Sequence, residues 1–189
     1  MWRHLELLQD LYTKDSLTGL YNRFGFNSEG VLLFNRCKAN NSKMVLMFVD
    51  INRMKLINDY YGHLQGDMAI KTVAEVIRNS IPQEFKAIRF GGDEFLIVGE
   101  YEDEDGIKTI QQNIMDGVKN LGKSMNYPFY LSVSCGYLHF VPSADDSLDT
   151  YIKQADESMY EIKAYMHTSD KELKEFVEKC ANSRENGIL

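Results

Sequence analysis

Three acidic residues stand where carboxylates could bind a divalent metal ion. Asp50 ends an uninterrupted apolar run, and Asp93 and Glu94 follow the pair Gly91-Gly92. If the segments before them are neighbouring strands, the three carboxylates meet at one edge of a sheet. A hard divalent cation relieves the repulsion between clustered carboxylates, so this arrangement predicts a Mg²⁺ or Mn²⁺ site. A metal held in this way orients phosphate groups for in-line attack.

Polar residues that follow Asp50 have types suited to a nucleotide. Lys55 and Asn58 lie within about one turn of an expected short helix, whose free N–H groups would attract phosphate. His63 and Asp67 are four residues apart, a spacing that places both on one helix face. An Asn and an Asp together can read guanine, because the carboxylate accepts hydrogen bonds from the ring N–H and the exocyclic amine. The sequence therefore favours a guanine nucleotide.

Each of these features alone has a simpler structural explanation. A single Asp after a strand is most often a turn residue, and paired glycines usually form a hairpin turn. Asn58-Asp59 alone would be a polar patch at a helix end, and His63 alone a cap or a surface residue. Only the combination supports a functional interpretation.

Periodicity and turn residues predict the elements that position these side chains. Two short apolar runs around Gly91-Gly92 indicate a hairpin, and Gly136 is a candidate bulge. Strands that alternate with helices around a hairpin predict an α+β fold, with helices packed on a central, mostly antiparallel sheet. The expected helices span 1–13, 22–38, 52–61, 65–80, 104–121, 147–166 and 169–180, and the expected strands span 44–49, 87–90, 95–98 and 129–140.

Length and charge limit the classes of protein to consider. The chain has 189 residues and a formal net charge of −7, which fits one domain with a helical extension and argues against nucleic-acid binding. Its three cysteines form no C-x-x-C pair, so we expect a reducing compartment and no zinc site. We find no signal-peptide pattern and no membrane-spanning run. We therefore expect a cytoplasmic location, either free or as the cytoplasmic part of a membrane-bound sensor.

Four blocks of sequence, in order, resemble the GGDEF domain family of diguanylate cyclases. Residues 89–95 read RFGGDEF, which resembles the signature that names the family. Residues 15–23 resemble its opening D-x-L-T-G-L-x-N-R, and residues 50–67 resemble its D-x-[DN]-x-x-K-x-x-N-D-x-x-G-H-x-x-G-D block. Residues 155–163 resemble its A-D-x-x-[LM]-Y-x-x-K helix. Ordered blocks over most of the chain are far more specific than a lone short motif.

The resemblance implies a fold and a division of the chain. The family fold is a central sheet flanked by helices and is related to the palm of nucleotidyl cyclases and polymerases. We expect the GGDEF domain at residues 15–168, after a linker or signalling helix at 1–14 and before a C-terminal helix and tail at 169–189. The first helix either docks on the domain or ends a signalling coiled coil from an upstream sensory domain.

The resemblance also implies roles for individual residues. Asp50 and Asp93 are expected to bind two Mg²⁺ or Mn²⁺ ions with help from the Ile51 carbonyl and Glu94, and Glu94 is a candidate to deprotonate the attacking 3′-hydroxyl. Asp93, Glu94 and Lys163 form the expected catalytic set. The backbone of Arg53 and Met54, with Lys55 and Lys163, is expected to hold the triphosphate, and Asn58 and Asp67 are expected to read guanine. The other residues expected to contact GTP are His63, Gly91 and Gly92.

These roles imply a diguanylate cyclase, which condenses two GTP molecules into cyclic di-GMP and releases two pyrophosphates. One domain binds one GTP, so activity requires a homodimer, which an upstream sensory domain would control. The alternative is a catalytically silent module that binds GTP or a protein partner. A palm-type polymerase that extends a nucleic acid fits poorly, because it would need a basic groove and the net charge is −7.

Two departures from the family pattern bear on regulation and activity. The inhibitory product-binding R-x-x-D is replaced by residues 82–85, which read PQEF, so feedback by that route is not expected. His167 stands where a phosphate-binding Arg is common. A His carries less charge at neutral pH and cannot bind phosphate with a planar pair of donors. His167 is therefore the change that favours the silent alternative.

Overall fold

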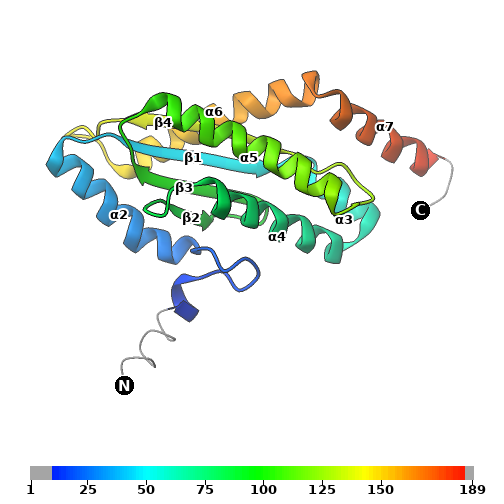
Figure 1. The fold of residues 1–189 in the computed structure, drawn as a ribbon, viewed down its shortest axis with the longest axis horizontal. Helices are drawn as coiled ribbons and strands as arrows, with labels where there is room; N and C mark the ends of the chain where they lie inside the picture. The colour runs from blue at the N-terminus through cyan, green and yellow to red at the C-terminus, as the bar shows by residue number, and fades with distance from the viewer. Residues whose placement is uncertain (1–9, 186–189) are drawn as a thin grey trace.

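A four-stranded antiparallel sheet lies at the centre of the molecule (Figure 1). The computed structural model describes residues 10–185. The strand order is β2-β3-β1-β4. The strands are β1 (Met44–Ile51), β2 (Lys86–Arg89), β3 (Glu94–Glu100) and β4 (Val133–Phe140). The predicted α+β fold with an antiparallel sheet is thus confirmed.

The central strand β1 is buried along its whole length, which explains why its sequence is apolar without interruption. Successive side chains point to opposite faces of a sheet. Met44, Leu46 and Phe48 belong to the core on one face, whereas Val45 and Met47 belong to the core on the other.

Helices cover both faces of the sheet (Figure 1). One face carries α2 (Arg23–Asn40) and α6 (Leu148–Ser169), and the other carries α4 (His63–Ser80) and α5 (Glu104–Ser124). The short helix α3 (Met54–Tyr61) follows β1, and α7 (Lys171–Glu185) packs against α3 and α6. In the described part of the chain, no helix is long and apolar enough to cross a membrane.

Two helix starts follow from side chains that cap them. The Asn22 side chain accepts a hydrogen bond from the Gly25 N–H at the start of α2, and the Ser147 hydroxyl accepts one from the Thr150 N–H at the start of α6. Such caps satisfy N–H groups that lack partners within the helix. The predicted starts of these two helices are confirmed to within one residue.

Several predicted boundaries are wrong. The strand predicted from Phe129 begins only at Val133, because residues 127–132 form an irregular segment whose aromatic side chains pack into the core. Gly136 makes no bulge, since the pairing of β4 with β1 is continuous. A Cβ atom on Gly136 would lie 2.4 Å from the Met159 backbone nitrogen, so this glycine lets α6 approach the sheet. The predicted helix at 1–13 lies outside the described residues except for 10–13, which are helical.

Candidate functional site

The end of β1 brings two of the predicted carboxylates together. Asp50 pairs in register with Glu94 of β3, and directly opposite residues of antiparallel strands point to the same face. The Ile51 N–H donates to the Asp93 carbonyl over 3.2 Å, which fixes the loop before β3 against the end of β1. The predicted neighbouring position of these two segments is therefore confirmed.

Asp50 is a buried carboxylate with an incomplete set of partners. Only 3 % of the residue is exposed. Burial, with the charges of Asp93 and Glu94, raises the pKa of Asp50 to about 6, although the nearby Lys163 ammonium opposes this shift. Lys163 Nζ lies 2.7 Å from Asp50 Oδ1 as an ion pair. Among the described residues, no group makes a hydrogen bond of good geometry to this buried Oδ1. Lys163 is thus the cation that faces this oxygen, and a metal ion would have to displace it.

The acidic groups fit a hard divalent cation in chemistry, although they are not assembled as a ligand set. Burial raises the pKa of Glu94, and the charges of Asp93 and Asp156 raise it further. Carboxylate oxygens are the ligands that Mg²⁺ prefers. Within residues 10–185, no three His, Cys, Asp or Glu side chains lie close enough together to hold a metal. Binding an ion here would require Lys163 to move away from Asp50.

The two glycines of the loop between β2 and β3 serve different purposes. Phe90 and Gly91 both donate their N–H groups to the Glu94 carbonyl, over 2.9 and 3.1 Å. A Cβ atom on Gly91 would lie 2.6 Å from Glu94 Oε2, whereas nothing lies within 4 Å of a Cβ on Gly92. Gly91 therefore makes room for the Glu94 carboxylate, and Gly92 leaves the loop open to a ligand.

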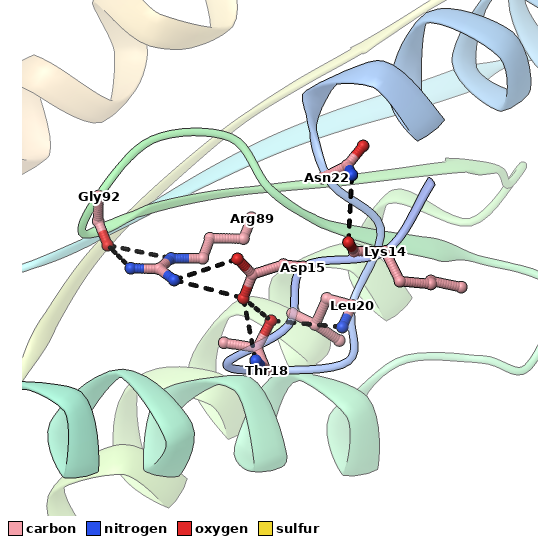
Figure 2. Close-up of polar contacts among 7 residues, drawn as sticks. All are labelled: Lys14, Asp15, Thr18, Leu20, Asn22, Arg89 and Gly92. Atoms are coloured by element: carbon pink, nitrogen blue, oxygen red, sulfur yellow. Dashed lines mark hydrogen bonds and ion pairs between the residues drawn. The ribbon is translucent and has the colours of Figure 1, made fainter. Parts of the chain in front are cut away.

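Arg89 holds this loop in place, a role that the sequence did not reveal (Figure 2). Its guanidinium donates to the Gly92 carbonyl over 2.7 and 3.1 Å and to the Asp15 carboxylate over 3.2 and 3.3 Å. Asp15 also accepts bonds from the Thr18 N–H and hydroxyl. Burial opposes the charged form of Asp15, but the bonds from Thr18 and Arg89 outweigh it and lower its pKa. Arg89 thus ties the Gly-Gly loop to the turn at residues 15–20.

A cavity of about 430 Å³ lies between α3, α4 and this loop. The tight junction of the two helices shapes it: Gly62 has a φ of 82°, and a Cβ atom on Gly66 would lie 2.0 Å from Asn58 Oδ1. Gly66 therefore gives the Asn58 side chain its place against α4. The cavity is lined by Met54, Lys55, Asn58, Asp59, His63, Asp67, Ile70, Arg89, Gly92 and Asp93.

The predicted site residues thus form two adjacent groups. One lines the cavity; the other comprises Asp50, Ile51, Arg53, Gly91, Glu94 and Lys163, none of which lines it. Asp93 lines the cavity and also raises the pKa of Asp50 through its charge. Asp93 therefore connects the acidic residues around Asp50 to the cavity.

The start of α3 is suited to an anion. Arg53 adopts the left-handed conformation at φ 57°, and no side chain caps the helix. The first N–H groups of an uncapped helix attract negative charge. The Asn52 side chain points away from this site, since it is buried and bonds to Ser132 and Ser134.

His167 lies near the positive charges of Arg53 and Lys163. Burial lowers the pKa of His167, and the charges of Arg53 and Lys163 lower it further. Its Nε2 atom is buried and has no hydrogen-bond partner among the described residues. His167 is therefore expected to be neutral at pH 7, beside two cations that an anionic ligand would satisfy.

Comparisons with known proteins identify the family of the chain. A family profile described as "Diguanylate cyclase, GGDEF domain" matches residues 12–169. The diguanylate cyclase DgcP of Escherichia coli is 34% identical over 163 residues, which cover 84% of this chain and 46% of DgcP. The cyclic di-GMP phosphodiesterase NbdA of Pseudomonas aeruginosa is 29% identical over 157 residues, which cover 83% of this chain and 20% of NbdA. The chain thus spans less than half the length of these relatives.

A solved structure shows the same fold. The coiled coil and GGDEF domain of DgcB from Caulobacter crescentus, crystallised in complex with c-di-GMP, superposes with a TM-score of 0.77 at 25% sequence identity. The match covers 90% of this chain and 88% of that one. Together with the profile match over residues 12–169, this likeness establishes that the chain belongs to the GGDEF domain family.

Proposed function

We propose that this domain is a diguanylate cyclase, which condenses two GTP molecules into cyclic di-GMP and two pyrophosphates. One observation carries the proposal: a cavity lined by Asn58 and Asp67 opens beside the cluster of acidic residues around Asp50. Asp93 lines the cavity and also belongs to this cluster. The identity to DgcP supports it. Cyclic di-GMP in the DgcB complex supports guanine as the base that such a fold binds.

Recognition of GTP is assigned to three parts of the site. Asn58 and Asp67 hydrogen-bond the guanine edge, and His63 lies beside them at the cavity wall. The N–H groups of Arg53 and Met54 at the start of α3 bind phosphate. Lys55 and Lys163 add positive charge around the triphosphate.

The carboxylates are assigned to metal binding and proton transfer. Asp50, Asp93 and Glu94, with the Ile51 carbonyl, would hold one or two Mg²⁺ or Mn²⁺ ions, which would neutralise phosphate charge and lower the pKa of the attacking hydroxyl. Glu94 is also assigned to accept the 3′-hydroxyl proton, because a carboxylate within reach of that hydroxyl can act as a general base. The oxygen then forms a bond to the α-phosphorus of the other GTP, and the bond to pyrophosphate breaks.

Two such domains must meet to complete the ring, because each nucleotide supplies one 3′-hydroxyl and one α-phosphate. Each protomer holds its own GTP, and the two sites face each other. Catalysis then depends mainly on positioning and charge neutralisation. We place this reaction in the cytoplasm, under the control of a sensory domain that brings two copies together.

A second candidate is a silent module that binds GTP without condensing it. Two observations favour it: His167 is held neutral where a phosphate-binding Arg is common in the family, and the carboxylates are not assembled as a metal site within residues 10–185.

Product analysis separates the two candidates. The chain is incubated with GTP and Mg²⁺ at several protein concentrations, and cyclic di-GMP and pyrophosphate are measured. We expect product formation that rises more steeply than the protein concentration, and no product from an Asp93→Ala variant. GTP binding without product at any protein concentration would instead support the silent module.

A further inference from the structure

Four aromatic rings in contact connect α7 to α4, and two of their three contacts are stacked while the middle one is tilted. Phe176 of α7 stacks on Tyr61 at 6.4 Å between ring centroids, Tyr61 lies 5.5 Å from Phe129, and Phe129 stacks on Tyr127 at 4.9 Å. The Tyr127 hydroxyl lies 2.7 Å from Thr72 Oγ1 on α4. We call Phe176, Tyr61, Phe129 and Tyr127 the aromatic ladder.

Helix α7 is an integral part of the core, although it lies beyond residue 169, where the family match ends. Leu173, Phe176 and Cys180 are buried in the core that α4 and α5 share with the sheet. The Tyr60 hydroxyl donates to the Cys180 carbonyl. This helix thus lies outside the family match and contacts the last two residues of α3.

The contacts of α7 lie directly behind the residues assigned to guanine. Tyr61 is the last residue of α3, Gly62 makes the turn, and α4 begins at His63. Asn58 lies about one turn before this corner and Asp67 about one turn after it. Asn58 Oδ1 lies against Gly66 in the first turn of α4, so the placement of Asn58 beside Asp67 depends on how α3 meets α4 at this corner.

We propose that α7 is a positioning element for guanine recognition, acting through the aromatic ladder and the Tyr60–Cys180 hydrogen bond. The proposal rests on the assignment of Asn58 and Asp67 to guanine under the proposed function. Phe176 and Tyr61 do not line the cavity. They fix the corner between α3 and α4, so that Asn58 and Asp67 face the same base.

Nucleotide selectivity tests this role without depending on catalysis. The probes are 3′-deoxy-GTP and 3′-deoxy-ITP, which cannot condense because they lack the attacking 3′-hydroxyl. 3′-Deoxy-ITP also lacks the exocyclic amine from which the Asp67 carboxylate would accept a hydrogen bond. For Phe176→Ala we expect binding of 3′-deoxy-GTP to weaken by about five- to tenfold, the loss of one base hydrogen bond. Binding of 3′-deoxy-ITP should change little, so that the preference for guanine falls. Tyr60→Phe removes only the hydroxyl and should give the same change on a smaller scale.

A core truncation on the other sheet face is the matched control. Phe34 is as buried as Phe176, but it packs among α2 and α6. Phe34→Ala should lower the thermal midpoint while keeping the preference for 3′-deoxy-GTP. Unchanged selectivity in Phe176→Ala and Tyr60→Phe, or an equal loss in Phe34→Ala, would overturn the proposal. Failure of the cyclase assignment is seen separately, as a wild-type chain that binds 3′-deoxy-GTP but makes no cyclic di-GMP from GTP.

Discussion

At the scale of single residues, Arg89 joins two loops that are far apart in the sequence. The ion pair with Asp15 is only 17% and 19% exposed on its two sides, so solvent screens it less than a surface pair. The same guanidinium also binds the Gly92 carbonyl, on the loop that lines the cavity. Its contribution should therefore be both to stability and to the shape of the site.

Arg89→Lys keeps the charge but removes the planar fork that reaches Gly92 and Asp15 together. We expect a loss of about 0.5–1.5 kcal/mol of stability, the net contribution of a typical hydrogen bond, because the bonds to Asp15 are part-buried and those to Gly92 are exposed, and a lower kcat for cyclic di-GMP formation. Thermal unfolding and steady-state kinetics measure the two effects. Arg36→Lys is the control, since the Arg36 side chain is 60% exposed in its pair with Glu100 and such a pair should contribute little. Equal losses in both variants would contradict the assignment.

His167 offers a direct test of the phosphate end of the site. Burial and the charges of Arg53 and Lys163 lower the pKa of His167, so its side chain carries little charge. An Arg at this position would add a permanent charge and two donors. We expect His167→Arg to tighten GTP binding by roughly three- to tenfold. Affinity for GMP, which lacks the outer phosphates, should stay the same. A similar gain for GMP would place His167 away from the β- and γ-phosphates.

The candidate site residues could be proposed from the sequence because each belongs to a local pattern. Asp50 ends an apolar run and Asp93 follows two glycines, and both features can be recognised without knowledge of the fold. The partners of Arg89 could not be found in this way, since Asp15 lies 74 residues away. Only the folded sheet brings the turn at 15–20 beside the loop.

At the scale of elements, the errors lie where tertiary packing overrides local propensity. Phe129, Tyr130 and Leu131 read as part of a strand because aromatic and apolar residues are common in strands. In the structure, Phe129 stacks in the aromatic ladder instead and the strand starts at Val133. A pattern of period two cannot distinguish burial in a sheet from burial in an irregular segment.

The junction between α6 and α7 depends on the charge of Asp170. Its carboxylate accepts bonds from the Leu173 N–H and the Tyr130 hydroxyl and pairs with Lys119. Burial opposes the charged form, but these partners outweigh it and lower the pKa of Asp170 below its ordinary value of 3.8. Because the pKa is lower in the folded state, the stabilisation is complete above the ordinary value and is lost as pH falls through the folded value.

Asp170→Asn should therefore lower the thermal midpoint near neutral pH, and the gap to the wild-type chain should narrow once the pH falls below 3.8. Thermal unfolding from about pH 7 to about pH 2.5 measures the gap. Asp145→Asn is the control, because Asp145 is exposed and its substitution should leave no gap at any pH. A gap of constant size across this range would mean that the charge of Asp170 does not stabilise the junction.

At the scale of the whole molecule, the proposed reaction requires two copies of one site. The chain carries one Asn58–Asp67 pair at one cavity, whereas cyclic di-GMP contains two guanines. Each of the two new bonds joins a 3′-oxygen from one protomer to an α-phosphorus held by the other. An inactive protomer in the pair therefore prevents closure of the ring, even when its partner is intact.

A large excess of Asp93→Ala domain, mixed with a fixed amount of wild-type domain at saturating GTP, should capture the wild-type protomers in mixed pairs. We expect cyclic di-GMP formation to fall steadily toward zero as the variant is added, because the variant keeps Asn58 and Asp67 but lacks a carboxylate assigned to the metal. Serum albumin at the same concentration controls for non-specific effects and should leave the rate unchanged. If the rate does not change when the variant is added, either a single domain suffices for the chemistry or Asp93 is needed for pairing. Sedimentation of the variant with GTP distinguishes these two explanations.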